Sequence, residues 1–487
     1  MISPTTPSAD TTWTGRSFPV AAHEMLANSQ IRRNVRNATN IIQNKRNKVV
    51  GELPDWEQLR EAGAALRAHA LEHLDDYLIE FEAACTKAGG IVHWAVDSAE
   101  AQQIVLGLLK EKAVSEVVKI KSMTTEEIRL NAALEAAGIH AVETDLAELI
   151  IQLGEDRPSH IVVPALHKNR QQVREIFARK MNLPGLSDKP EELTNAARGY
   201  LRKKFLTTPV AISGANFLVA ENGAVGIVES EGNGRMCLTL PKTLISIAGI
   251  DKIIPRFQDL EVLLQTLPRS ATGERMNPYN SLWTGVYPGD GPEEFHVILV
   301  DNGRSRILAD KEARQTLQCI RCAACVNACP VYHQIGGHAY DSAYAGPIGA
   351  ILTPQLADMK AGRSLPYASS LCGACYQACP VKINIPEVLI HLRSKVVIQD
   401  QKTLNGSLGI WNLGMQAAKV AFEHTLLFTT GQKLARVGQK LLVSKDGYIE
   451  WLPSIGGGWT KTRDLPALPK LTFREWWAQR EESRKKS

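Results

Sequence analysis

Seven of the nine cysteines in this 487-residue chain lie between Cys319 and Cys379. A segment with so many thiols folds around metal ions or disulfide bonds, so the cysteines constrain its fold more than any other feature does. Residues 1–17 are rich in Ser, Thr and Pro and lack the apolar region of a secretory signal. We therefore expect a cytoplasmic chain whose thiols stay reduced, and a metal centre rather than disulfides.

The first four cysteines have the spacing of a bacterial ferredoxin. Their motif is Cys319-x2-Cys322-x2-Cys325-x3-Cys329-Pro330. In such a run, three thiolates on a tight loop hold one iron–sulfur cluster, and the fourth, followed by proline, ligates the other cluster.

A second motif, Cys372-x2-Cys375-x3-Cys379-Pro380, repeats the first at a distance of 50 residues, and Val381 continues the match. The spacing predicts an internal repeat with two [4Fe–4S] clusters. In crossed ligation each loop lends its last cysteine to the other cluster. The predicted ligands are Cys319, Cys322, Cys325 and Cys379 for the first cluster, and Cys329, Cys372 and Cys375 for the second.

The second cluster is one cysteine short, because the position that corresponds to Cys319 is Ser369. Four arrangements remain open. Ser369 supplies an oxygen ligand, the fourth iron is open or carries water, Cys237 folds in from a distance, or the cluster has three irons. Each changes the charge and hydrogen bonding around the cluster, and both tune its potential.

A structural zinc site is the main alternative to iron–sulfur clusters, but zinc sites use well-separated Cys-x2-Cys pairs. The other two cysteines, Cys85 and Cys237, are expected to be buried apolar residues. Arg321, inside the first loop, either raises the potential of that cluster or faces solvent. His333 and His338, between the motifs, are expected to be hydrogen-bonded spacer residues.

Residues from about 60 to 303 alternate predicted strands and helices, which favours a mostly parallel sheet. An amphipathic helix or helix pair over Trp56–Cys85 precedes the strands. The predicted strands are Ile91–Val96, which is expected to be buried, Val114–Ile120, His140–Thr144 and Ile161–Ala165. The predicted helices are Ala99–Glu111, Thr125–Ala137, Leu146–Leu153 and Asn169–Met181. Closely spaced strands then predict an antiparallel addition, at Val210–Ala220, Ala224–Glu229, Met236–Leu240, Leu244–Ile250 and His296–Val300.

Four parts are predicted along the chain. They are an N-terminal arm with helices (1–59), an α/β domain (60–303), a two-cluster ferredoxin-type domain (304–398) and a C-terminal helical extension (399–487) that contains an amphipathic stretch, Leu408–Phe422. The net charge of +5 is spread in mixed sign, which gives no reason to expect a nucleic-acid partner. The Gly-rich motifs of Rossmann and P-loop sites are absent from the sequence.

Several strings resemble the lactate-utilisation protein B family, and the match covers most of the chain. They are Lys121-Ser-Met-Thr-Thr-Glu-Glu-Ile128, Pro164-Ala-Leu-His-Lys-Asn169, Glu231-Gly-Asn-Gly-Arg235, Asp301-Asn-Gly-Arg-Ser305, Cys319-Ile-Arg-Cys-Ala-Ala-Cys325 with its Cys-Pro, and Tyr367-Ala-Ser-Ser-Leu-Cys372.

The resemblance implies a lactate-utilisation α/β domain, similar in fold to CoA-transferase and ribose-5-phosphate-isomerase proteins, followed by an α-helical two-cluster ferredoxin-like domain. It implies two [4Fe–4S] clusters, the second with only three recognised cysteine ligands. The implied function is electron transfer in the oxidation of L-lactate to pyruvate, as a non-autonomous component of an L-lactate dehydrogenase complex.

The implied partners are an iron–sulfur subunit with Cys-Cys-Gly motifs, which this chain lacks, and a small subunit of the same α/β domain type. A peripheral contact with the inner face of the membrane or with a quinone is also expected. A second hypothesis makes the α/β domain itself a catalytic or binding module for a small carboxylate. Lys121, Glu127, His167 and Lys168 would line its pocket.

Overall fold

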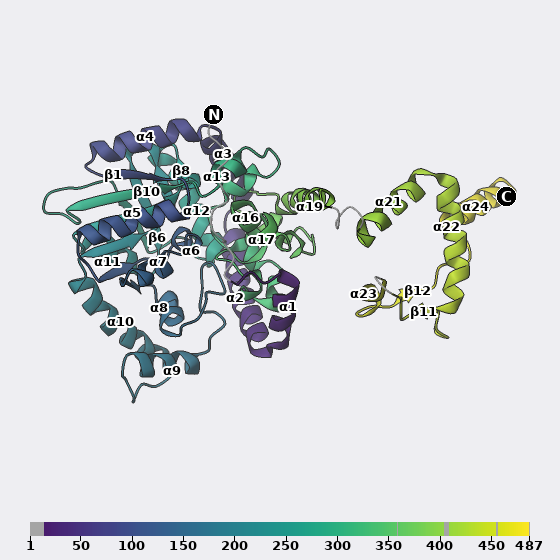
Figure 1. Ribbon diagram of the computed structural model, residues 1–487, viewed down its shortest axis with the longest axis horizontal. Coiled ribbons are helices and arrows are strands. Elements are labelled where there is room, and N and C mark those ends of the chain that lie inside the picture. Colours follow the sequence, from purple (N-terminus) through teal and green to yellow (C-terminus); the bar gives the residue numbers. More distant parts are fainter. Residues whose placement is uncertain (1–13, 358, 404–408, 454–455, 487) are drawn as a thin grey trace. The chain divides into compact units, whose positions relative to one another are not determined.

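The computed structural model describes residues 14–357, 359–403, 409–453 and 456–486 (Figure 1). The chain forms two compact units, Met1–Val396 and Val397–Ser487. The first unit contains a six-stranded sheet, a four-stranded sheet and all seven clustered cysteines.

A six-stranded sheet forms the centre of the α/β part. Its strands have the order β1-β10-β7-β4-β2-β3, and each neighbouring pair is parallel. The predicted mostly parallel sheet is therefore confirmed. The strands are β1 (Ile91–Ala95), β2 (Glu116–Lys119), β3 (His140–Glu143), β4 (Val210–Ser213), β7 (Thr243–Gly249) and β10 (Glu294–Val300).

Helices cover both faces of this sheet, and β7 shows why. All of its residues are buried, and successive side chains point to opposite faces. Leu244 and Ala248 pack in one core with α4 and α11, while Ile245 and Ile247 pack in another with α5 and α7. A parallel strand that is apolar at nearly every position is typical of this layered arrangement. The helices of this part are α3 (Trp56–Glu72), α4 (Leu74–Lys87), α5 (Ser98–Glu111), α6 (Met123–Glu127), α7 (Leu130–Ala136), α8 (Leu146–Leu153), α9 (Arg170–Lys180), α10 (Pro190–Thr207), α11 (Asn233–Thr239) and α12 (Leu260–Ala271).

A second sheet has the order β8-β5-β6-β9. β6 pairs antiparallel with both β5 and β9, whereas β5 and β8 are parallel. The predicted antiparallel addition is thus confirmed for this sheet, but β4, β7 and β10 belong to the parallel sheet instead. The strands are β5 (Phe217–Val219), β6 (Ala224–Glu229), β8 (Ile253–Ile254) and β9 (Tyr279–Trp283).

Two N-terminal helices, α1 (Phe18–Ala27) and α2 (Ser29–Gly51), lie on the cysteine region. Val35 of α2 is fully buried in the same hydrophobic cluster as six of the cysteines. The Nη2 atom of Arg46 donates to the carbonyl oxygen of Ala378 at 3.0 Å. The first 13 residues of the predicted arm lie outside the described residues.

The cysteine region is built from short helices and turns, as the ferredoxin-like prediction requires. Its helices are α13 (Arg304–Leu308), α14 (Ala324–Asn327), α15 (Tyr332–Ile335), α16 (Gly346–Leu356), α17 (Met359–Gly362), α18 (Ala374–Ala378) and α19 (Ile385–Gln401). α14 and α18, one from each cysteine motif, pack against each other.

Two predicted strands are wrong. Ile161–Ala165 forms bends and turns, because Ile161 packs among the cysteines rather than in the sheet. Met236–Leu240 falls in and just after helix α11. The carboxylate of Glu229 accepts the backbone N–H groups of Gly232 and Arg235 there and so caps the first turn.

Two further details differ from the prediction. The helix expected over Thr125–Ala137 is divided into α6 and α7 at Arg129, which has a left-handed φ of 51°. Its cap is Ser122, whose hydroxyl accepts from the N–H of Thr125. Strand β1, expected to be buried, is an edge strand with Trp94 43% exposed.

The second unit consists of helices and a two-stranded antiparallel sheet. Its helix α21 covers most of the predicted amphipathic stretch, whose residue 408 lies outside the described residues. Its elements are α21 (Ile410–Glu423), α22 (Thr425–Gly438), α23 (Gly457–Thr460), α24 (Phe473–Lys486), β11 (Tyr448–Ile449) and β12 (Leu465–Pro466). Among the described residues, no helix is both long and apolar enough to cross a membrane.

Candidate functional site

The two cysteine loops have the same backbone shape at positions 50 residues apart. Arg321 and Leu371 have left-handed φ values of 61° and 56°, and Ala323 and Gly373 have values of 62° and 82°. Each pair is followed by a short helix, α14 or α18. Because a positive φ is uncommon for residues other than glycine, the matching turns indicate one loop shape used twice.

Ser369 makes the contact that Cys319 makes in the other loop. The Sγ atom of Cys319 accepts a hydrogen bond from the N–H of Arg321 at 3.4 Å. The Oγ atom of Ser369 accepts one from the N–H of Leu371 at 3.1 Å. The serine therefore has the same local position as the first cysteine of the run.

The thiols form two sets, and the first draws on both motifs. Burial raises the pKa of Cys322, and the nearby charges of Cys379 and Cys319 raise it further. The pKa of Cys325 is raised by burial, then by the charges of Cys319, Cys322 and Cys379, and last by that of Cys375 in the second motif. Cys379, from the second motif, thus lies with the three cysteines of the first loop.

The second set contains Cys329, Cys372 and Cys375. Burial raises the pKa of Cys375 to about 12, and the charges of Cys329 and Cys372 add to the rise. Cys237 does not join this set. It is buried in the α/β core with its Sγ 3.7 Å from the Oγ1 of Thr144.

Both sets fit iron–sulfur clusters better than single zinc ions. Four thiolates bound at about 2.3 Å around a tetrahedral zinc would have their sulfur atoms only about 3.8 Å apart. In the described part of the chain, no three cysteine sulfurs lie within 4.8 Å of one another. Buried, mutually repelling thiolates need compensating positive charge, and a larger metal cluster would supply it.

The surroundings of the two sets differ. Four buried or largely buried arginines approach the backbone of the first set: Arg46, Arg60, Arg67 and Arg321. Cys372 of the second set is exposed. The first set is therefore a buried, positively charged site, and the second lies at the surface.

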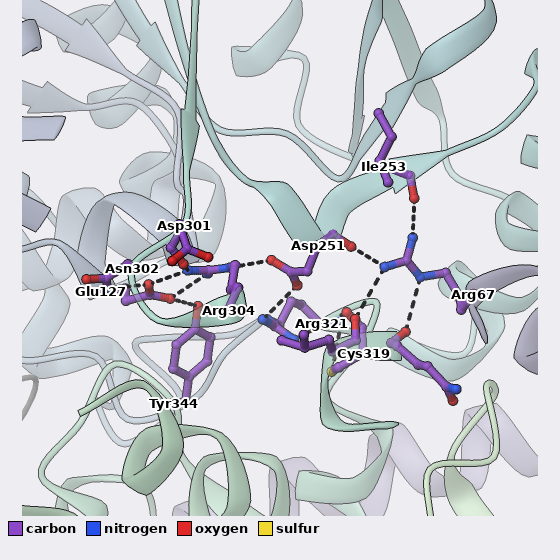
Figure 2. A network of polar contacts seen from close by, with 12 residues as sticks. Arg67, Glu127, Asp251, Ile253, Asp301, Asn302, Arg304, Cys319, Arg321 and Tyr344 are labelled. Atoms are coloured by element: carbon purple, nitrogen blue, oxygen red, sulfur yellow. Dashed lines mark hydrogen bonds and ion pairs between the residues drawn. The ribbon is translucent and has the colours of Figure 1, made fainter. Parts of the chain in front are cut away.

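A buried ion network (Glu127, Asp251, Arg304 and Arg321) joins the α/β part to the first cysteine loop (Figure 2). Arg304 donates twice to Glu127, at 2.9 Å each, and also pairs with Asp251. Arg321 donates to the other oxygen of Asp251 at 3.3 Å and to the carbonyl oxygen of Cys319 at 3.2 Å. Arg321 is 7% exposed, so of the two alternatives given for it, the one in which it faces solvent is wrong.

A cavity of about 670 Å³ lies between the α/β part and the first cysteine loop. Part of its wall is formed where β2, β4 and β7 end, the edge at which open parallel sheets bind ligands. Lys121, predicted to line a pocket, lies in the wall, whereas Glu127, His167 and Lys168 do not. The wall includes Ile41, Lys121, Asn233, Lys252, Leu267, Arg321 and Cys322.

The predicted pocket residues outside this wall have partners elsewhere. Glu127 belongs to the buried ion network. His167 is hydrogen-bonded to Ser159 at 2.7 Å and to Asp156 at 3.0 Å, and Lys168 pairs with Asp156. Of the four predicted pocket residues, only Lys121 therefore faces the cavity.

Comparisons with known proteins agree with this architecture. Residues 78–300 match the LUD domain, and residues 315–383 match the 4Fe-4S dicluster domain. The chain is 45% identical to "Lactate utilization protein B 1" of Bacillus mycoides over 92% of both chains. It is 42% identical to "Lactate utilization protein B" of Bacillus subtilis, over 96% of this chain and 97% of that protein. The chain belongs to the lactate utilization protein B family. A crystal structure of a DUF162 family protein from Deinococcus radiodurans covers 48% of this chain and 98% of that chain, with 11% identity and a TM-score of 0.25, too low to support an argument.

The strings that resemble the lactate utilization protein B family gather around the cavity and the network. The string that begins at Lys121 contributes four consecutive cavity residues and then Glu127. Asn233 comes from a second string and also lines the cavity. Asn302 and Arg304, from a third, donate to Glu127. Residues distant in sequence thus converge at one edge of the sheet.

Both spacer histidines are hydrogen-bonded, as expected. His333 donates to the carbonyl oxygen of Asn327 at 2.6 Å, and His338 donates to that of Arg157 at 2.8 Å.

Sequence reasoning missed Lys252, Asp251 and the arginines of the N-terminal helices. Lys252 is 7% exposed and lines the cavity. Burial, together with the charge of Arg321, lowers its pKa to about 7. It follows β7 at the same sheet edge as Lys121, and only the strand order, which the sequence does not give, could have connected the two residues.

Proposed function

We propose that this chain is the iron–sulfur electron-transfer subunit of a complex that oxidises L-lactate to pyruvate. The main support for the proposal is that each loop places its last cysteine with the thiols of the other loop. Cys379 lies with the first set and Cys329 with the second, as crossed ligation in a two-cluster ferredoxin requires. The names of the relatives and the dicluster match support the lactate role and the cofactor type.

The proposed ligands follow from the two sets. The first [4Fe–4S] cluster is held by Cys319, Cys322, Cys325 and Cys379, and the second by Cys329, Cys372 and Cys375. We assign the fourth position of the second cluster to the Oγ of Ser369. Its hydrogen bond to Leu371, matched by that of Cys319 to Arg321, supports this assignment.

A bound [4Fe–4S] cluster carries one electron at a time, so two clusters match the two electrons released when a 2-hydroxy acid becomes a 2-oxo acid. The arginines around the first set stabilise added negative charge there and thereby raise its potential. The exposed Cys372 makes the second set the site of electron exchange with a partner protein. We propose that the partner is an iron–sulfur subunit with Cys-Cys-Gly motifs, joined by a small subunit with the same α/β domain.

We also propose that the second unit makes a peripheral contact with an anionic membrane surface, where a quinone could take the electrons. Residues 397–487 contain 14 Lys or Arg and 8 Asp or Glu, so their net charge of +6 exceeds the +5 of the whole chain. Large apolar side chains are exposed in the same unit, including Trp459, Trp476 and Trp477. Basic residues beside exposed aromatic side chains are typical of segments that bind membrane interfaces.

The direct test is to purify the whole chain without oxygen. We expect a brown protein with about eight iron atoms and two distinguishable signals in electron paramagnetic resonance. L-Lactate should reduce both clusters once the partner subunits are added. A colourless protein with stoichiometric zinc, or clusters that lactate cannot reduce in the complete complex, would contradict the proposal.

A further inference from the structure

The cavity beside the first cysteine loop has a positive group without a partner. Lys252 is 7% exposed and lines the cavity. Within the described residues, its ammonium group makes no hydrogen bond or ion pair. Because Lys252 is largely buried, its ammonium can contact water only through the cavity, and such incomplete hydration of a charged group is unfavourable. An anion that enters the cavity would restore the missing contact.

Other side-chain nitrogens in the cavity wall also lack a hydrogen-bond acceptor in the described part of the chain, and a polar ligand would supply one. Lys121 is paired with Glu148 at 3.1 Å, but its ammonium makes no hydrogen bond in the described structure. The Nε of Arg321 is buried and has no acceptor among the described residues. The Nη atoms of Arg321 are held by Cys319 and Asp251, so this guanidinium is fixed in the wall.

Asn233 supplies an acceptor. Its Nδ2 donates to the hydroxyl oxygen of Thr144 at 3.2 Å. That hydroxyl uses its own hydrogen on the carbonyl oxygen of Lys119, at 2.9 Å, and so can only accept from Asn233. This fixes the orientation of the amide and leaves its Oδ1 without a partner among the described residues. A ligand hydroxyl is the group that this oxygen would accept.

The rest of the wall combines apolar side chains, among them Ile41 and Leu267, with the carboxylates of Asp145, Glu229 and Glu274, and the first loop contributes Cys322. These carboxylates already have partners: Asp145 and Glu229 accept backbone N–H groups, and Glu274 pairs with Lys45. The volume of about 670 Å³ is within the range of small-molecule sites and exceeds what a three-carbon acid fills. The site therefore combines cations, an acceptor and an apolar surface beside a cluster ligand.

We propose that this cavity binds a 2-hydroxy carboxylate, with the carboxylate at Lys252 and Arg321 and the hydroxyl at Asn233. The assignment deepens the proposed function, on which it rests, because it locates the acid in this subunit and next to the first cluster. The spare volume and apolar wall favour acids with side chains longer than that of lactate.

The test uses the cluster-loaded full chain without partner subunits. Calorimetry is expected to detect L-lactate and, more tightly, (S)-2-hydroxybutanoate, whereas propanoate and inorganic phosphate bind more weakly. Replacing Lys252 with the similarly shaped, uncharged Met (Lys252→Met) should weaken binding by about tenfold or more. Lys242→Met is the matched control, because Lys242 is exposed and pairs with Glu293 outside the cavity.

The second readout is spectroscopic. In the dithionite-reduced chain, the hydroxy acid should alter the paramagnetic resonance signal of the first cluster and leave that of the second unchanged. Unaltered binding in a folded Lys252→Met variant would overturn the assignment, and so would equal affinity for phosphate. If partner subunits still deliver lactate electrons to the clusters while the chain binds no acid, the proposed function stands and this inference fails. If the chain binds the acid but its clusters are never reduced, the site stands and the electron-transfer role fails.

Discussion

Ser369 has the same local position in the second cysteine loop as Cys319 has in the first. Each accepts a hydrogen bond from the N–H two residues later, through Oγ at 3.1 Å and through Sγ at 3.4 Å. The two loops therefore differ at this point in the chemistry of the ligand atom and not in the path of the chain.

Two substitutions at Ser369 distinguish the possible arrangements of the fourth ligand of the second cluster. Ser369→Ala removes the oxygen, so mild oxidation should convert the second cluster from about four irons to about three. Ser369→Cys should keep its iron and shift only its potential. Mössbauer and paramagnetic resonance spectra measure both effects. If the alanine variant keeps its iron and spectrum, the fourth site is open or water-bound instead.

Crossed ligation predicts which cluster's paramagnetic resonance signal changes when each cysteine is replaced. Cys379→Ser should alter the resonance of the first, buried cluster, although Cys379 belongs to the second motif. Cys329→Ser should alter that of the second cluster. Redox titration followed by paramagnetic resonance distinguishes the two. The reverse pattern, with each substitution affecting the cluster of its own motif, would contradict the exchange.

The buried ion network should be important for stability. Glu127→Gln leaves Arg304 with only part of its compensating charge in a site that is 1% exposed. Breaking such a buried pair costs about 3–5 kcal/mol. Anaerobic urea unfolding, followed by circular dichroism, measures the loss. Arg256→Met breaks the exposed pair with Asp259 and should cost less than about 1 kcal/mol. Similar effects in the two variants would mean that the network is not important for stability.

Because His160 is buried in its neutral form, the folded protein is expected to lose stability in acid. Its pKa is lowered to about 4 by burial, and its ring accepts the N–H of Val162 at 3.1 Å and of Val163 at 2.9 Å. The unfolded chain, with a histidine pKa of about 6.5, binds the proton first, so stability falls as the pH drops below that value. Between pH 7 and 5 this group should account for about 2 kcal/mol.

The matched variant for this effect is His160→Gln, which does not titrate in that range. Its unfolding free energy should fall less than that of the unchanged chain over the same interval. Parallel pH profiles would show that His160 is not the group responsible.

The second unit should bind anionic vesicles. Vesicles with a large share of phosphatidylglycerol are expected to sediment with the full chain at low salt, and neutral phosphatidylcholine vesicles are not. The double change Arg474→Glu and Arg480→Glu should reduce this binding, while Lys242→Glu, in the first unit, should not. Equal binding to neutral vesicles would contradict an electrostatic contact.

Local patterns predicted much of the fold, because they depend on neighbouring residues. The continuous apolar runs gave β7 and β10, and the helical spacing gave α3, α4 and α5. Ile161–Ala165 has the composition of a strand but packs on the cysteine region, a tertiary contact that periodicity cannot report. Met236–Leu240 was missed as a helix because its cap, Glu229, precedes the segment by several residues.

In the candidate site, too, local sequence predicts some features and tertiary packing decides others. The spacing of the cysteines predicted the two sets, since ligands of one loop are close in sequence. Lys252 follows β7, Asn233 begins α11 and Arg321 lies in the first cysteine loop, so only the tertiary packing of these separated segments brings them together. Their convergence depends on the topology, which no single segment encodes.

The N-terminal helices depend on segments that are synthesised much later. Arg32 donates to Gln334 at 3.0 Å across 302 residues, and Arg46 to Ala378 at 3.0 Å across 332. During synthesis on the ribosome, the surface on which α1 and α2 pack is therefore incomplete until nearly four-fifths of the chain has emerged. Since α2 packs against the thiol-bearing loops, iron delivery and the docking of this early segment are coupled steps of maturation, and a chain that fails to load iron should remain sensitive to proteases at its N-terminal end.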